Sequence, residues 1–141
     1  MSNNLSYPEL MALRYMNVQS GNGFSVDKDL KGYSPTREAY AVGGAELESF
    51  STPCQSVCND DLSFNKFKRI MDSKIEFMER TEFSDDFLNV KVIGAWVNDD
   101  DYAYIEVSNV LFDREEAIAL GKERGEEAIW DFKNNCEIKL T

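Results

Sequence analysis

Carboxylates are the most prominent reactive side chains in this sequence, and many of them stand in short runs. Two interpretations of the runs are open. In the first, they cap helices and keep the chain soluble. In the second, several runs share one face and present negative charge to the basic groove of a nucleic-acid-binding protein, where electrostatic steering would speed association. The runs are Asp60-Asp61, Asp85-Asp86, Asp99-Asp100-Asp101, Glu115-Glu116 and Glu126-Glu127.

The sequence offers little equipment for catalysis. It contains no histidine, which excludes Ser-His-Asp triads, Cys-His nucleophiles and His-ligated zinc centres within this chain. Asp99, Asp100 and Asp101 present several oxygens to a hard cation, but the spacing of an EF-hand loop is absent, and we interpret them as a polar hairpin tip. Acid–base catalysis needs carboxyls in two different environments, whereas adjacent exposed acids share one. We therefore expect no catalytic residue, no bound metal and no cofactor.

The remaining reactive groups also favour structural roles. The three cysteines, Cys54, Cys58 and Cys136, are an odd number, so we expect reduced thiols rather than a complete disulfide framework. Gly43-Gly44 fits neither a P-loop nor a dinucleotide-binding loop, and we interpret these residues as turn glycines.

The charge balance restricts the kind of partner. The chain has 26 acidic and 15 basic residues, a net charge of −11 at pH 7 and an isoelectric point near 4.4. Binding to nucleic acid or anionic lipid relies on Lys and Arg, so we expect a protein partner with a basic surface and no direct binding to nucleic acid. There is no apolar run of about 20 residues and no signal peptide, which favours a cytoplasmic protein that does not bind membranes. The sequence leaves the oligomeric state open.

Helix signals appear at three places. Ser6 and Glu9 have the spacing of a capping box, with Pro8 in the first turn, and predict a short helix over residues 7–18. Apolar residues and Lys74 recur at three- and four-residue intervals over residues 62–80, which predicts the longest helix, with Asp60 and Asp61 at its start. Asp113 begins a third helix with the same capping-box spacing.

Strand signals surround these helices. Segments 90–97 and 102–107 flank a polar turn and predict an antiparallel hairpin in which Ala103, Ile105 and Val107 face the core. Segments 128–132 and 136–140 predict a terminal hairpin, and segments 24–26 and 39–42 predict two short strands. We therefore expect residues 1–141 to form one compact acidic α+β domain. It has a mainly antiparallel sheet, a long central helix and two shorter helices on one side.

Four aromatic residues of the predicted strands also allow two interpretations. They form an exposed contact patch or belong to the core, and we favour the core, because aromatic side chains in strands are usually buried. These residues are Trp96, Tyr102, Tyr104 and Trp130.

Two stretches of the chain resemble small uncharacterised proteins of phages and plasmids. The segment from Gly23 to Asp27, together with Gly32, Pro35-Thr36 and Tyr40 to Gly43, is similar to a GF-x-VD…G…PT…YAVG pattern. The segment from Tyr104 to Asp131 is similar to a strand followed by DREEA…LG and AIWD. The resemblance covers about half the chain and implies a mobile-element origin and a role against host defences, but no active site.

These observations combine into a functional hypothesis. We expect a phage-encoded, non-enzymatic inhibitor that binds a basic nucleic-acid-binding site of a bacterial defence complex, such as a CRISPR effector or a restriction enzyme. The alternative is an immunity or antitoxin-like protein that neutralises one toxin, and a carboxylate- or metal-dependent hydrolase is a third reading. The expected partner-binding residues are Asp85, Asp86, Asp99, Asp100, Asp101, Glu115 and Glu116.

Overall fold

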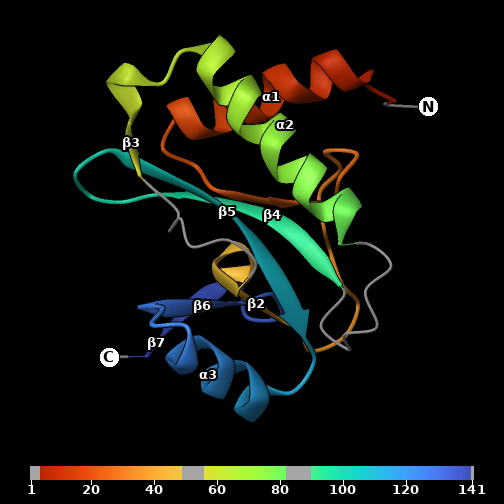
Figure 1. Cartoon of the computed structure of the whole chain (residues 1–141), viewed down its shortest axis with the longest axis vertical. Coiled ribbons are helices and arrows are strands. Elements are labelled where there is room, and N and C mark those ends of the chain that lie inside the picture. The colour runs from red at the N-terminus through yellow and green to blue at the C-terminus, as the bar shows by residue number, and fades with distance from the viewer. Residues whose placement is uncertain (1–3, 49–55, 82–89, 141) are drawn as a thin grey trace.

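Strands β4 (Lys91–Val97) and β5 (Tyr102–Leu111) form the centre of the sheet in this computed structural model, which describes residues 4–48, 56–81 and 90–140. The sheet is curled and antiparallel in the order β1-β4-β5-β2-β6-β7, and the short strand β3 also pairs with β5 (Figure 1). The other strands are β1 (Phe24–Val26), β2 (Tyr40–Val42), β3 (Val57–Cys58), β6 (Ala128–Asp131) and β7 (Cys136–Lys139).

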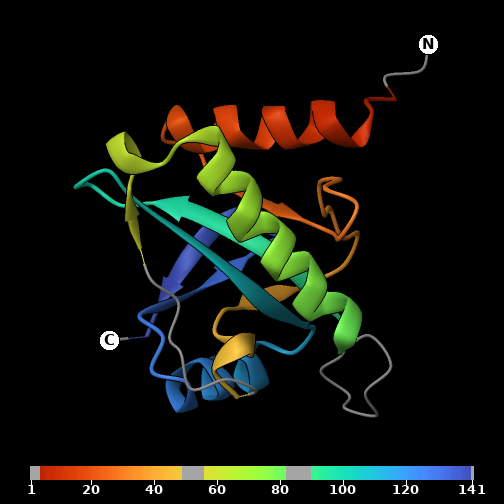
Figure 2. The same cartoon turned by 45° about the horizontal axis from the view of Figure 1, so that its top comes forward.

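The helices pack on two parts of this sheet. Helices α1 (Tyr7–Gln19) and α2 (Phe64–Arg80) pack on its β1-β4-β5 part, whereas α3 (Arg114–Glu123) packs on β2 and β6 at the other end (Figure 1 and Figure 2). Two short 3-10 helices, η1 (Ala45–Glu48) and η2 (Asn59–Asp61), complete the described elements. The α+β class and the mainly antiparallel sheet are confirmed. Within the described residues, none of the helices combines the length and apolarity that crossing a lipid bilayer requires.

Side-chain caps fix where the helices begin. The predicted capping box of α1 is present: Glu9 N donates to Ser6 Oγ at 3.3 Å, and Ser6 N donates to Glu9 Oε1 at 2.9 Å. At α3, Glu116 N donates to the carboxylate of Asp113 at 2.9 Å. These bonds satisfy backbone N–H groups that have no partner within the helix.

The start of α2 differs from the prediction. Residues Asn59 to Asp61 form the separate turn η2, and the cap of α2 is Ser63, whose Oγ accepts from Lys66 N at 3.1 Å. The interpretation of Asp60 and Asp61 as the cap is therefore wrong. A serine that lies three residues before a free helical N–H makes the cap directly, and the two acids remain exposed in the preceding turn.

Strand β5 contributes to every hydrophobic cluster of the fold. Ala103, Ile105 and Val107 are at most 5% exposed and pack with α1, α2, β1 and β4, as the alternation predicts. Further along the strand, Leu111 packs under α3, and Val110 packs on the opposite face of the sheet. One continuous strand thus joins the two halves of the molecule.

Phe67 is the residue of α2 that joins α1 to the sheet, and its loss should be costly. The Phe67 ring is fully buried, 5.5 Å from Tyr15 of α1 and 6.4 Å from Phe24 of β1. Phe67→Ala should lower the free energy of unfolding by about 3–5 kcal/mol, because it leaves a cavity in the larger core. Urea denaturation measures this change.

Phe64 provides the matched control. Its ring also contacts Tyr15, at 5.4 Å, but its side chain is 38% exposed. Phe64→Ala should cost less than about 1.5 kcal/mol. Equal losses from the two variants would contradict the packing described above.

Candidate functional site

The predicted acidic residues lie in separate parts of the fold. Asp99 and Asp100 are exposed at the turn between β4 and β5, whereas Glu115 and Glu116 are exposed in the first turn of α3. The ten residues of β5 separate these two groups by about 33 Å at 3.3 Å per residue (Figure 1). The structure does not bring them together in one cluster. Asp85 and Asp86 lie outside the described residues.

The β4–β5 turn is held rigidly, and Asp101 belongs to its framework. Asp101 has a φ of 63°, and its side-chain and backbone oxygens each accept a hydrogen bond from Asn59 at 2.9 Å. The Asn98 side chain accepts from the backbone N–H of Asp100 at 3.0 Å and of Tyr102 at 2.9 Å. Asn59 is 4% exposed and also donates to Val18 O at 2.9 Å, which ties the turn to α1.

The side chains of Asp99 and Asp100, unlike that of Asp101, do not belong to the framework of the turn. Among the described residues, none donates a hydrogen bond to their carboxylates or forms an ion pair with them. Two exposed carboxylates, unpaired within the described residues, therefore stand at the tip of this hairpin, where a cationic partner can approach them.

A pair of stacked aromatic rings, one exposed and one half-buried, lies on the same hairpin. Trp96 and Tyr104 are register partners, and their rings stack with centroids 4.2 Å apart and an interplanar angle of 5°. Trp96 is 44% exposed and Tyr102 is 42% exposed, so their assignment to the core is wrong. On β5 the odd-numbered side chains face α2, and the even-numbered ones therefore point to the other face. We call Trp96, Asp99, Asp100, Tyr102 and Tyr104 the hairpin surface.

The hairpin surface has the chemistry of a binding site for cations. An Arg side chain can stack on an aromatic face while its N–H groups pair with a carboxylate. Trp and Tyr are also enriched among the residues that dominate the energy of protein interfaces. The arrangement can therefore recognise a basic protein surface, and it contains no nucleophile or buried base.

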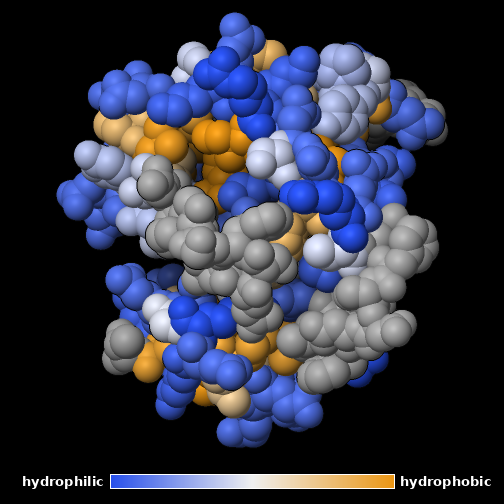
Figure 3. Space-filling model, viewed as in Figure 1, coloured by the Kyte–Doolittle hydropathy of each residue, from blue (hydrophilic) through white to orange (hydrophobic). Residues whose placement is uncertain are grey.

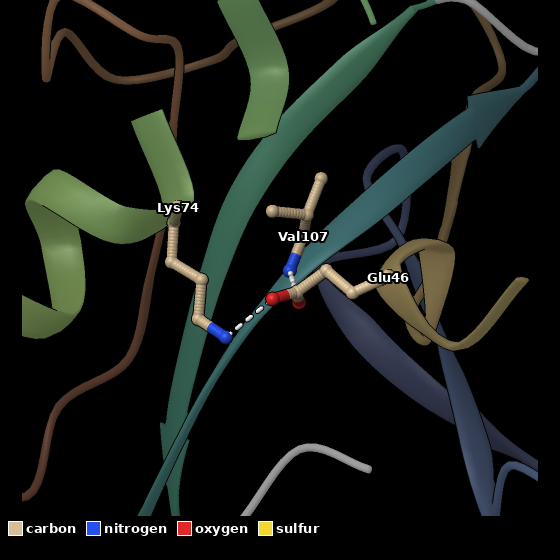
Figure 4. A network of polar contacts seen from close by, with 3 residues as sticks. All are labelled: Glu46, Lys74 and Val107. Atoms are coloured by element: carbon tan, nitrogen blue, oxygen red, sulfur yellow. Dashed lines mark hydrogen bonds and ion pairs between the residues drawn. The ribbon is translucent and has the colours of Figure 1, made fainter. Parts of the chain in front are cut away.

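A second group of charged residues lies inside the molecule, where the sequence analysis placed no site. Glu46 of η1 accepts from Lys74 Nζ at 2.5 Å and from the backbone N–H of Val107 at 2.8 Å (Figure 4). The side chains of Lys74 and Glu46 are only 14% and 16% exposed. The one sequence signal for this contact is the position of Lys74 in an otherwise apolar stripe of α2.

Two further carboxyls meet beside this ion pair, at Gly43. A Cβ atom on Gly43 would collide with Glu106 Oε1 and would lie 2.6 Å from Glu126 Oε1, so a larger residue here would displace both carboxyl groups. Arg124 holds this segment in place by donating to Gly43 O at 3.0 Å and to Asn109 Oδ1 at 2.7 Å. Gly44 has a φ of 81° and is a turn glycine, as predicted.

The environment of Glu106 changes its protonation. Burial, followed by the charge and hydrogen bonding of Glu126 and the charge of Glu46, raises the pKa of Glu106 from 4.5 to about 8, although Lys74 partly opposes the shift. Glu106 therefore keeps its proton at neutral pH. The proton removes the repulsion that two adjacent carboxylates would otherwise feel.

The described residues contain few other candidates for chemistry. Cys58 and Cys136 are free thiols, and Cys54 lies outside the described residues. In the described part of the chain, no three Asp, Glu or Cys side chains are grouped so that they could hold one metal ion.

No protein-family model, curated protein or solved structure matches this chain. The resemblance to phage and plasmid proteins therefore stays a prediction.

The raised pKa of Glu106 predicts a specific pH dependence of stability. Between about pH 4.5 and pH 8 the folded chain keeps a proton that the unfolded chain has lost, so stability falls as the pH rises through this range. Glu106→Gln is neutral at every pH and should escape this loss. Relative to the wild type, the variant should gain about 4 kcal/mol between pH 5 and pH 9, measured by urea denaturation.

Glu127→Gln removes one carboxylate at an exposed position next to this pair and serves as the control. Its difference from the wild type should stay nearly constant over the same pH range. A Glu106→Gln curve that runs parallel to the wild-type curve would show that Glu106 is ionised in the folded chain.

Proposed function

We propose that this protein is a non-catalytic inhibitor that docks its hairpin surface on a cationic protein site. The observation that carries the proposal is the Trp96–Tyr104 stack, with Trp96 exposed, on the same hairpin as the exposed carboxylates of Asp99 and Asp100. The stack supplies apolar contact area, and the carboxylates supply complementarity to Arg and Lys.

The rigidity of the turn favours tight binding. Association costs free energy when flexible groups become ordered, and a preformed surface avoids much of this cost. The hydrogen bonds of Asn59 and Asn98 hold the β4–β5 turn before any partner arrives. The stacked rings of Trp96 and Tyr104 likewise lose little freedom on binding.

The overall charge suggests which cationic site is bound. A net charge of −11 attracts the protein to basic surfaces and speeds the encounter. Sites that bind nucleic acid are rich in Arg and Lys, so a protein that occupies such a site excludes the nucleic acid. Together with the resemblance to phage and plasmid proteins, this favours a nucleic-acid-binding component of a bacterial defence complex, met in the host cytoplasm.

The proposal gives different roles to the predicted partner-binding residues. Asp99 and Asp100 contact the partner, whereas Asp101 holds the turn through Asn59. Glu115 and Glu116 lie in the first turn of α3, where negative charge stabilises a helix, and they are not needed for docking.

Binding should therefore depend on the hairpin surface at the start of β5 and not on Glu115 and Glu116, which follow the end of this strand. In a lysate of a bacterial host, the wild-type chain should capture a protein that also binds nucleic acid. Trp96→Ala, and separately the double variant Asp99→Asn with Asp100→Asn, should weaken the purified complex about tenfold or more, measured by calorimetry. The double variant Glu115→Gln with Glu116→Gln removes the same charge and should bind like the wild type.

Salt and competition test the mechanism. Affinity should fall as ionic strength rises, and nucleic acid should compete with the chain for the captured protein. A complex that depends on Glu115 and Glu116 but not on Trp96 would contradict the hairpin as the docking surface. Capture of a single toxin that binds no nucleic acid would replace the defence-complex partner with the immunity-protein alternative.

A further inference from the structure

A groove of about 370 Å³ runs along α2, on a part of the molecule distinct from the hairpin surface. Its lining residues stand at positions i, i+3, i+4, i+7 and i+8 of the helix, a spacing that places side chains on one face. Figure 3 shows the surface hollowed next to α2, which crosses the same view in Figure 1. The lining residues are Lys66, Arg69, Ile70, Ser73 and Lys74.

The charge of this groove is opposite to that of the chain. Among its described lining residues, three are cationic, one of them the Lys74 that pairs with Glu46, and none is acidic, although acids outnumber bases by 26 to 15 in the sequence. The acidic residues Asp72 and Glu79 of α2 lie near Tyr7 of α1, where they and the burial of the ring raise the Tyr7 pKa. The third acid of α2, Glu76, lies 3.9 Å from the guanidinium of Arg80.

The groove is rich in hydrogen-bond donors that have no acceptor. In the described part of the chain, no side chain or backbone group accepts a hydrogen bond from the Lys66 ammonium or the Arg69 guanidinium. Lys74, which also lines the groove, uses one of its three N–H donors on Glu46 (Figure 4). The hydroxyl of Ser73 adds a further donor between the cations.

We propose that this groove binds a small phosphate-bearing ligand. A phosphate group offers several oxygens in different directions, which suits a forked guanidinium, two ammonium groups and a hydroxyl around one volume. A carboxylate has only two oxygens and would leave part of the donor set unused. Ile70 supplies an apolar contact for the organic part of the ligand.

Titration calorimetry with inorganic pyrophosphate, at constant ionic strength and with the full chain, tests this site. We expect saturable binding that Arg69→Gln and Lys66→Gln each weaken about tenfold. Both side chains line the groove, and neither has a partner among the described residues, so the variants should keep the wild-type circular dichroism spectrum. Lys68→Gln is the matched control, because it removes the same charge from an exposed position of α2 outside the groove, and it should bind like the wild type.

Three results would overturn the proposal. The first is the absence of saturable binding to pyrophosphate or to a phosphomonoester. The second is equal weakening by Lys68→Gln and Arg69→Gln, which would show attraction to the helix charge rather than a site. The third is binding to anionic vesicles or a single-stranded oligonucleotide without binding to pyrophosphate. None of these results bears on the hairpin surface, which the partner experiments test separately.

Discussion

The backbone N–H of Val107 imposes the main constraint on this structure. One edge of β5 pairs continuously with β4, but the other edge pairs with β3 at one end and with β2 at the other. The Val107 N–H points to this second, divided edge of β5, at a position between the segments that pair with β3 and with β2. A buried donor without an acceptor would be costly there. Glu46 supplies the acceptor, and Lys74 of α2 neutralises its charge. One carboxylate thus links η1, α2 and the central strand.

The surfaces of the molecule follow from this arrangement. Odd-numbered side chains of β5 fill the core under α2, so Tyr102 and Tyr104 point to the other face and complete the hairpin surface with Trp96. Glu106 lies beside the divided edge, where Gly43 and Glu126 enclose it. Lys74 lines the α2 groove and also pairs with Glu46, so an internal ion pair and an external cationic surface share one residue.

The sequence predicts those parts of the fold that depend on neighbouring residues. The capping box of α1, the β4–β5 hairpin and the α+β class are confirmed, because each depends on a spacing of a few residues or on strand alternation. The ion pair of Glu46 and Lys74 joins residues 28 positions apart, and the bond from Val107 to Glu46 spans 61 positions. No local pattern encodes such contacts. The exposure of Trp96 was also missed, because alternation assigns a residue to a face but does not say which face is covered.

Hydrogen exchange of the Val107 amide, followed by NMR, tests most directly whether the divided strand edge organises this fold. The account predicts that this amide is as well protected as the amides of β5 that bond to β4, although its acceptor is a side chain. In Glu46→Ala the protection of Val107 should be lost first, while the amides bonded to β4 keep most of theirs. Rapid exchange of Val107 in the wild-type chain, at the rate of an exposed loop amide, would contradict the account.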